Sequence, residues 1–348
     1  NSCLDALIVA LNETCDAGSW YTSTKELRLV SLEFCIACRS CQIIHLTVNA
    51  QVPRRLLAAV DAPPPHPKRL CGTRVARLGA RRVTWNMPTS AELRNPVFAI
   101  ADVNCLEFGH AFTGSLKAVA WPRRLKTIKF RQFYTFDMPI GLVEWPASLK
   151  RLAFGRAFNQ PLERSNFPAS VQELQLGDKF THPIEDAPWP ASLRRLVFGT
   201  YFNKPIEGIL WPDSLERLDF GERFNQPVDN VRWPASLEEI TFGSCSGSDE
   251  DWMMMYSNFN QQIGSSHWPA SLRRLTVGGI FRQSLQGLGT WMPNLEAVRV
   301  LDWEYHSRDL RGIQWPKGLR ELTVFKVSSL DGVVTPSTVQ VYRPHLKF

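Results

Sequence analysis

A two-residue mark, Trp-Pro, recurs along the chain and constrains its fold more than any other feature. Through the middle of the sequence the marks lie 22 residues apart, with Phe-Pro replacing Trp-Pro at Phe167. Trp233 and Trp268 lie 35 residues apart, so 13 extra residues are inserted between them, and Trp-Met-Pro at Trp291 is a slipped copy of the mark. A fixed period of this length is typical of a solenoid, in which each turn of chain stacks on the next. The marks are at Trp121, Trp145, Trp189, Trp211, Trp233, Trp268 and Trp315.

The residues after each mark follow a common pattern, Leu-x-x-Leu-x-Phe-Gly. In one copy this pattern is formed by Leu193, Leu196, Phe198 and Gly199. The last two apolar residues alternate with polar ones, which is the periodicity of a β-strand, and the glycine permits a turn. A single strand of about three to five residues cannot bury its own apolar side chains. We therefore expect neighbouring repeats to stack, with parallel strands and buried tryptophans.

A second signature follows each strand. It reads Phe-Asn-x-Pro and then Ile, Leu or Val, as in residues 202–206. Together the two signatures resemble the FNIP repeat, a variant of the leucine-rich repeat, over about residues 103–325. The resemblance implies a curved solenoid that binds other proteins and has no catalytic activity. Strong copies begin at Phe158, Phe202, Phe224 and Phe259, and weaker copies begin at Phe136, Phe180 and Phe281.

Degenerate copies of the strand pattern extend the repeat in both directions, at residues 43–49, 82–86, 103–112 and 335–344. The predicted fold is a repeat solenoid, leucine-rich-repeat-like. It has a parallel β-sheet with one short strand per repeat of about 22 residues, and an irregular convex side. We place the solenoid at residues 43–348, with regular repeats over about 103–325, an insertion over 244–258 and a C-terminal cap over 326–348.

Residues 1–42 have a different period. Apolar residues between Leu4 and Leu11 share one helical face, and residues 23–41 also fit a helix that begins with a capping box. These helices would form an N-terminal cap that shields the first strand. Alternatively, the segment "ELRLVSLEF" is similar to the end of an F-box, which implies binding to the adaptor of a cullin-type ubiquitin ligase. The adaptor-binding residues would then be Leu27, Leu29, Val30 and Phe34.

Composition limits the classes of function. The net charge is +7 and basic residues are dense over 54–82, so nucleic-acid binding is a third, less favoured reading. The sequence contains no catalytic motif, and the seven histidines show no metal-ligand spacing. Cys35, Cys38 and Cys41 supply only three of the four ligands that a zinc site needs. We therefore expect a protein that is not an enzyme and uses no cofactor or metal.

No apolar run reaches the roughly 18 residues of a membrane-spanning helix. We expect an intracellular, cytoplasmic monomer with no membrane contact. Because the sequence begins at Asn1 rather than at methionine, we also expect it to be a fragment.

Protein binding is the function that the repeat pattern favours. Strand residues beside the inward Leu and Phe point to the concave face, and they vary between repeats while the inward ones scarcely change. Arg195, Arg217 and Arg274, with Arg151 nearby, are expected to form a basic stripe, although an ordinary solvated face is the alternative. The candidate partner-binding residues are Arg151, Glu173, Gln175, Arg195, Arg217, Asp219, Glu239 and Arg274.

The insertion over 244–258 is a second candidate binding element. It carries three acidic residues at 249–251, followed by Trp252, Met253, Met254 and Met255. Methionine and tryptophan on a loop suit adaptable binding, whereas the alternative is a neutral loop folded back on the solenoid. The sequence therefore predicts a non-catalytic scaffold that recognises a protein partner through its concave face and this loop.

Overall fold

The structure is a computed structural model, and it divides the chain into two compact units, Asn1–Gly155 (unit 1) and Arg156–Phe348 (unit 2). We describe each unit by itself. The described residues are 27–28, 45–49, 82–86, 90, 92–94, 103–110, 112–131, 136–245, 255–264, 267–302, 310–324, 333, 335–336 and 339–342.

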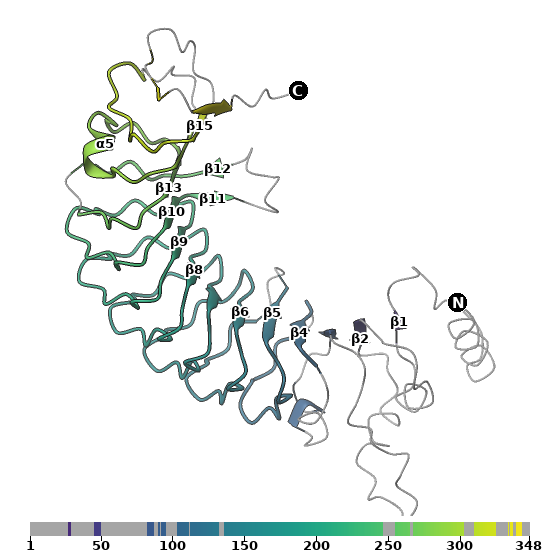
Figure 1. Cartoon of the computed structure of the whole chain (residues 1–348). Coiled ribbons are helices and arrows are strands. Elements are labelled where there is room, and N and C mark those ends of the chain that lie inside the picture. Colours follow the sequence, from purple (N-terminus) through teal and green to yellow (C-terminus); the bar gives the residue numbers. More distant parts are fainter. Residues whose placement is uncertain are drawn as a thin grey trace, which may run out of the picture. The chain divides into compact units, whose positions relative to one another are not determined.

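Unit 1 contains parallel strands that pair with one another in chain order (Figure 1). A short 3₁₀ helix, η2 (Glu92–Arg94), lies between two of them. The register places one apolar residue of each strand in a single row, for example Leu106 beside Ile128 and Ile128 beside Leu152. The strands are β1 (Leu27–Arg28), β2 (His45–Asn49), β3 (Arg82–Asn86), β4 (Cys105–Phe108), β5 (Thr127–Phe130) and β6 (Arg151–Ala153).

The expected helix over residues 23–41 is wrong at Leu27–Arg28, which form strand β1. Leu27 pairs in register with Leu46 of β2, so these two residues extend the parallel sheet. The alternation of Leu27 and Leu29 also fits a strand, and the available sheet edge outweighs the local capping signal. The rest of the expected helix lies outside the described residues.

Unit 2 has the same architecture, and its parallel strands again pair in chain order. In Figure 1 the strands lie along one side of the turns and the irregular segments along the other, with the short helix α5 (Leu288–Trp291) among the latter. The strands are β7 (Glu173–Gln175), β8 (Arg195–Val197), β9 (Arg217–Phe220), β10 (Glu239–Phe242), β13 (Arg274–Gly279), β14 (Ala297–Asp302), β15 (Glu321–Val324) and β16 (Gln340–Tyr342).

Stacked phenylalanine rings form the core of unit 2. The ring of Phe220 lies 5.5 Å from the ring of Phe198 and 5.5 Å from that of Phe242, nearly parallel to both. Phe224, from the second signature, stacks on Phe220 at 4.0 Å. Such pairs contribute about 0.5–1.5 kcal/mol each beyond the burial of their area. The predicted one-strand repeat with a continuous apolar core is therefore confirmed.

The tryptophans form a second column, as expected from their position. Trp211 and Trp233 stack at 6.4 Å and are only 8% and 9% exposed. In unit 1, Trp121 and Trp145 stack at 5.8 Å. Burial of these rings gives them a structural role, because each ring covers the ring of the next repeat.

Asparagine side chains join the second signatures of successive repeats. The Oδ1 atom of Asn203 accepts hydrogen bonds from the main-chain N–H of Asn225 and from the Nε2 group of Gln226, both at 2.9 Å. Asn225 accepts the equivalent bonds from Asn260 and Gln261. The polar residue of the signature therefore fixes the distance between neighbouring turns.

The insertion leaves this ladder unbroken. Strand β10 pairs directly with β13, so that Glu239 lies beside Arg274 in the same register as the regular repeats. The ends of the insertion form an antiparallel pair, β11 (Ser244–Cys245) and β12 (Met255–Tyr256), which extends away from the sheet (Figure 1). The repeats on either side of the insertion thus stack directly on each other.

Candidate functional site

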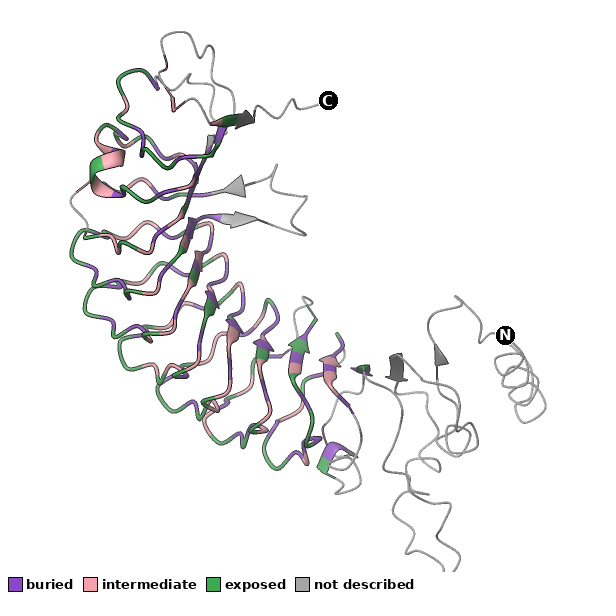
Figure 2. Cartoon of the chain, viewed as in Figure 1, coloured by how far each residue is buried: buried purple, intermediate pink, exposed green. Residues whose placement is uncertain are grey.

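The sheet face of unit 2 is the candidate site. We use this name for the two rows of strand side chains that flank the buried leucine row. Figure 2 shows exposed and half-buried positions alternating with buried ones along β8 and β9. In β10, β13 and β15 the second-row residues Thr241, Thr276 and Thr323 are buried. The first row is Glu173, Arg195, Arg217, Glu239, Arg274, Ala297 and Glu321, and the second is Gln175, Val197, Asp219, Thr241, Thr276, Arg299 and Thr323.

Three arginines of the first row are paired with carboxylates. Arg195 donates to Asp219, with its Nη2 atom 2.9 Å from Oδ2. Arg217 and Arg274 lie on either side of Glu239, each with a nitrogen 3.5 Å from its Oε2 atom. The expected basic stripe is therefore wrong in its charge: the arginines do line up, but carboxylates between them make the row nearly neutral.

The pKa of Arg195 reflects this environment. Burial by itself would lower the pKa of the guanidinium, but the neighbouring carboxylates, Asp219 above all and then Glu173 and Glu239, raise it above its ordinary value. Arg195 therefore stays charged. The side chains of Arg195, Arg217 and Arg274 are about half exposed, and ion pairs at such sites contribute about 1 kcal/mol or less to stability. The pairs orient the guanidinium groups more than they stabilise the fold.

Two other predicted residues occupy exposed strand positions. Gln175 is exposed at the start of the second row. Arg151 is exposed in β6 of unit 1, beside Thr127 of β5.

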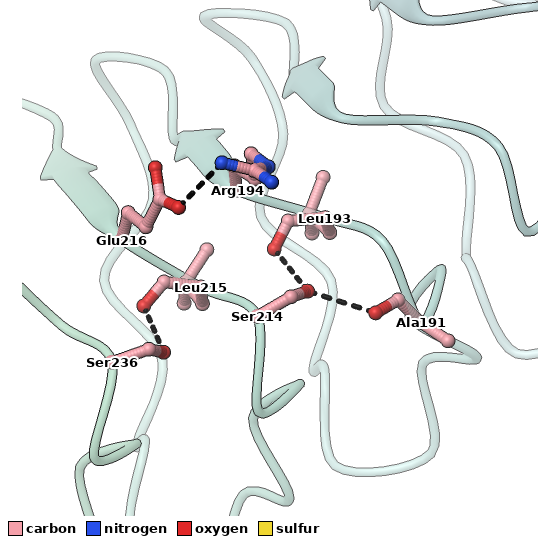
Figure 3. Close-up of polar contacts among 7 residues, drawn as sticks. All are labelled: Ala191, Leu193, Arg194, Ser214, Leu215, Glu216 and Ser236. Carbon is pink, nitrogen blue, oxygen red and sulfur yellow. Dashed lines mark hydrogen bonds and ion pairs between the residues drawn. The ribbon is translucent and has the colours of Figure 1, made fainter.

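The edge where the strands of unit 2 begin is occupied by contacts within the chain (Figure 3). The hydroxyl of Ser214 donates to the carbonyl oxygens of Ala191 and Leu193, each at 2.8 Å. Ser236 repeats the bond to Leu215, and Arg194 pairs with Glu216 at 2.8 Å. These groups join one repeat to the next, so they are already satisfied without a ligand.

The opposite edge, where the strands end, carries a smaller charged cluster. Arg156 pairs with Asp178 at 2.6 Å, and the guanidinium of Arg223 lies 4.3 Å above the ring of Tyr201. Partial burial, together with the negative charge of Asp178, raises the pKa of Glu222, although Arg223 and Arg156 oppose the shift. This cluster supplies one perturbed carboxyl group.

Most predicted site residues of the insertion and of the N-terminal segment lie outside the described residues. Met255 lies in β12 and pairs with Cys245 of β11, but Trp252, Met253 and Met254 are outside the described residues. Leu27 is in β1. The following predicted residues also lie outside the described residues: Leu29, Val30 and Phe34, the basic segment up to residue 81, and the cysteines at 35, 38 and 41. The F-box, nucleic-acid and metal readings therefore stay predictions.

The described residues contain no group of three or more His, Cys, Asp or Glu side chains that could hold a metal ion. None of the helices among them is both long and apolar enough to span a membrane.

The sequence profile of the FNIP Repeat family matches residues 136–179, 180–222 and 208–245. These residues are FNIP repeats. In unit 2 they carry the part of the sheet face from Glu173 through Glu239. The FNIP segment ends before the second strand of the insertion, although the Phe-Asn signature occurs again at Phe259.

One solved structure supports the same fold. CroV588, described as a novel circular LRR protein, matches with a TM-score of 0.58 and 24% identity over 77% of this chain. The chain spans only 40% of the length of that protein. The pneumococcal vaccine antigen PcpA (12% identity, 77% of this chain, 72% of that one) and a leucine-rich repeat protein from Bacteroides ovatus (10%, 70% and 75%) have TM-scores of 0.25 and 0.19. No curated protein matches the sequence.

Sequence reasoning missed two features of the site. It aligned the arginines but not their carboxylate partners, because the partner of Arg195 lies 24 residues ahead in the other row. It also left Arg299 out of the candidate set, although that arginine occupies the second row beside two threonines. The available signal was the change from Asp219 to Thr241 and Thr276, which removes acidic groups from that row.

Proposed function

We propose that this protein is a non-catalytic scaffold that binds a protein partner through the sheet face of unit 2. One observation carries the proposal: the inward rows repeat Leu and Phe, whereas the two rows of the sheet face differ in residue type from strand to strand. The stacking of repeats accounts for the buried rows but not for that variation. FNIP and leucine-rich-repeat solenoids are generally non-catalytic scaffolds, which is compatible with this function.

The electrostatics of the face favour recognition of a structured or peptide partner. Arginine is enriched at the centres of protein interfaces, and a guanidinium that is already held by Asp219 loses less side-chain freedom on binding. The first row carries charges of both signs in a fixed order, so a partner would need the complementary order of charges. Charge complementarity of this kind contributes more to specificity for one partner than to affinity.

The insertion extends this proposal. The pair β11 and β12 emerges between β10 and β13, at the end of two strands that contribute to the face. We propose that the intervening segment, with Trp252 and Met253–Met255, contacts the same partner. Flexible, polarisable methionine side chains adapt to different surfaces.

Photo-crosslinking tests the role of the sheet face. A benzoylphenylalanine at Val197, in the second row, should capture a partner in cells that express the chain, whereas the same residue at Leu210 should not. Leu210 is a suitable control because it is 84% exposed and lies outside the strands. The proposal fails if both positions capture the same proteins with equal yield.

The purified partner then allows a matched comparison of two adjacent arginines. Arg195→Ala should weaken binding by about tenfold or more, the loss expected for an interface anchor. Arg194→Ala should change it little, because Arg194 pairs with Glu216 at the edge of the sheet. Equal losses in the two variants would place the contact elsewhere.

A further inference from the structure

Arg299 differs from the other arginines on the sheet face of unit 2. Arg195, Arg217 and Arg274 each have a carboxylate within 3.5 Å. The side chain of Arg299 is exposed and makes no ion pair or hydrogen bond with the described residues. It is therefore a cation whose charge no described group of the chain compensates.

Short polar side chains lie on both sides of this cation. The register places Thr276 of β13 and Thr323 of β15 directly beside Arg299, each one strand away, a spacing of about 4.8 Å. Thr276 is 6% exposed and Thr323 is 7% exposed, so the guanidinium extends beyond both. Neither threonine side chain is hydrogen-bonded within the part of the chain that the structure describes.

This arrangement favours a single carboxylate over a more highly charged group. A guanidinium presents two parallel N–H donors that match the two oxygens of a carboxylate. Glu321 is exposed in the first row, diagonally across from Arg299 on the adjacent strand. Its negative charge opposes a dianion such as phosphate, and the paired arginines nearby add no free positive charge.

We propose that Arg299, with Thr276 and Thr323, binds the carboxylate of an Asp or Glu side chain in an extended acidic segment of the protein partner. The guanidinium donates two hydrogen bonds to the carboxylate, and a threonine hydroxyl donates to whichever oxygen faces it. This inference rests on the proposed function, because it names the chemistry of one contact within the same face.

Selection from a random-peptide phage library, with the full chain as bait, tests the inference without knowledge of the partner. Selected peptides are synthesised with a photo-crosslinker, which reports where each one binds. We expect peptides that crosslink to the sheet face to contain an Asp or Glu. Arg299→Gln should weaken their binding by about tenfold or more, whereas Arg194→Gln, at an arginine that pairs with Glu216 outside the two rows, should change it less than threefold.

Charge reversal separates a direct contact from damage to the fold. Arg299→Glu should lose the acidic peptide but bind a version in which the essential acid is replaced by Lys. Thr276→Val with Thr323→Val should give a smaller loss than Arg299→Gln, with an unchanged unfolding midpoint.

The outcomes distinguish this inference from the proposed function. Peptides that crosslink to the sheet face, lack an acidic residue and ignore Arg299→Gln would overturn the inference and leave the proposed function intact. Selection that yields only peptides bound outside the sheet face would count against both.

Discussion

The side-chain oxygen of Asn225 accepts a hydrogen bond from the main-chain N–H of Asn260 at 3.0 Å, across 35 residues of sequence. The same oxygen accepts from Gln261 Nε2 at 2.9 Å. The bond has the geometry seen between repeats that lack an insertion, as for Asn203 and Asn225. One asparagine thus joins the repeats on either side of the longest irregular segment in the FNIP-like pattern.

Removal of this acceptor should destabilise unit 2. Asn225→Ala removes the partner of the Asn260 N–H in a half-buried site and leaves Gln261 Nε2 only its 3.3 Å bond to the main-chain oxygen of residue 225. We expect it to lower the free energy of unfolding by about 1–3 kcal/mol. Asn230→Ala is the matched control, because Asn230 is exposed in the same repeat and its side chain makes no hydrogen bond with the described residues. Urea denaturation measures the unfolding midpoint of both variants. Equal midpoints would show that the asparagine hydrogen bonds between repeats do not stabilise unit 2.

A second prediction concerns a buried hydroxyl. Ser165 is 3% exposed, and its Oγ atom has no hydrogen-bond partner among the described residues. Other repeats have an apolar residue in this slot, such as Ile209 and Val231. Ser165→Val should therefore raise the free energy of unfolding by about 1 kcal/mol, because it removes an unsatisfied polar group and fills the slot.

Ser214→Val is the contrasting control for that experiment. The hydroxyl of Ser214 donates to two carbonyl oxygens, so the same chemical change there should lower the unfolding midpoint. If both substitutions shift the midpoint in the same direction, side-chain volume rather than hydrogen bonding controls these sites.

The third prediction is a dependence of stability on pH. The pKa of Glu222 is raised in the folded protein, so folding favours its protonated form. Its contribution is fully present below the ordinary value of 4.5 and is lost as the pH rises through the raised value. Glu222→Gln should therefore slightly stabilise the protein at neutral pH and change little at pH 3. Thermal unfolding at the two pH values measures the gain in unfolding temperature that Glu222→Gln gives over the unchanged protein. A gain that is smaller at neutral pH than at pH 3 would contradict the prediction.

The fourth prediction concerns the insertion. Replacement of residues 246–254 by a two-glycine turn should leave the unfolding midpoint unchanged, because β10 pairs with β13 and Phe242 stacks on Phe259 at 3.9 Å independently of the loop. The crosslinked partner should bind the shortened protein more weakly. Unchanged affinity would limit the binding surface to the sheet face.

The strands were predictable because the sequence repeats their burial pattern. Leu196 and Phe198 alternate with polar residues, and the same spacing returns in every regular repeat, so both the strands and their register follow. Leu27 and Arg28 were mispredicted as helix because a local capping signal says nothing about a free sheet edge nearby. Pairing with a neighbouring strand determines the secondary structure of such short segments.

The charge pairing on the face was not predictable from the same pattern. Arg195 bonds to Asp219, which lies on the next strand but in the other row. Which diagonal neighbour a long side chain reaches depends on strand twist and rotamer, and neither is encoded in the spacing of the repeat. The sequence could therefore locate the face but not its pattern of free and paired charges.

The tryptophan column also provides a spectroscopic signal of how the protein comes apart. Trp233 stacks on Trp211 on one side and on Trp268 at 5.3 Å on the other. Loss of the repeat that carries one of these rings would uncover its neighbours, so indole emission would shift to longer wavelength in steps as repeats detach from an end. Intrinsic fluorescence can thus distinguish gradual fraying from a single concerted transition.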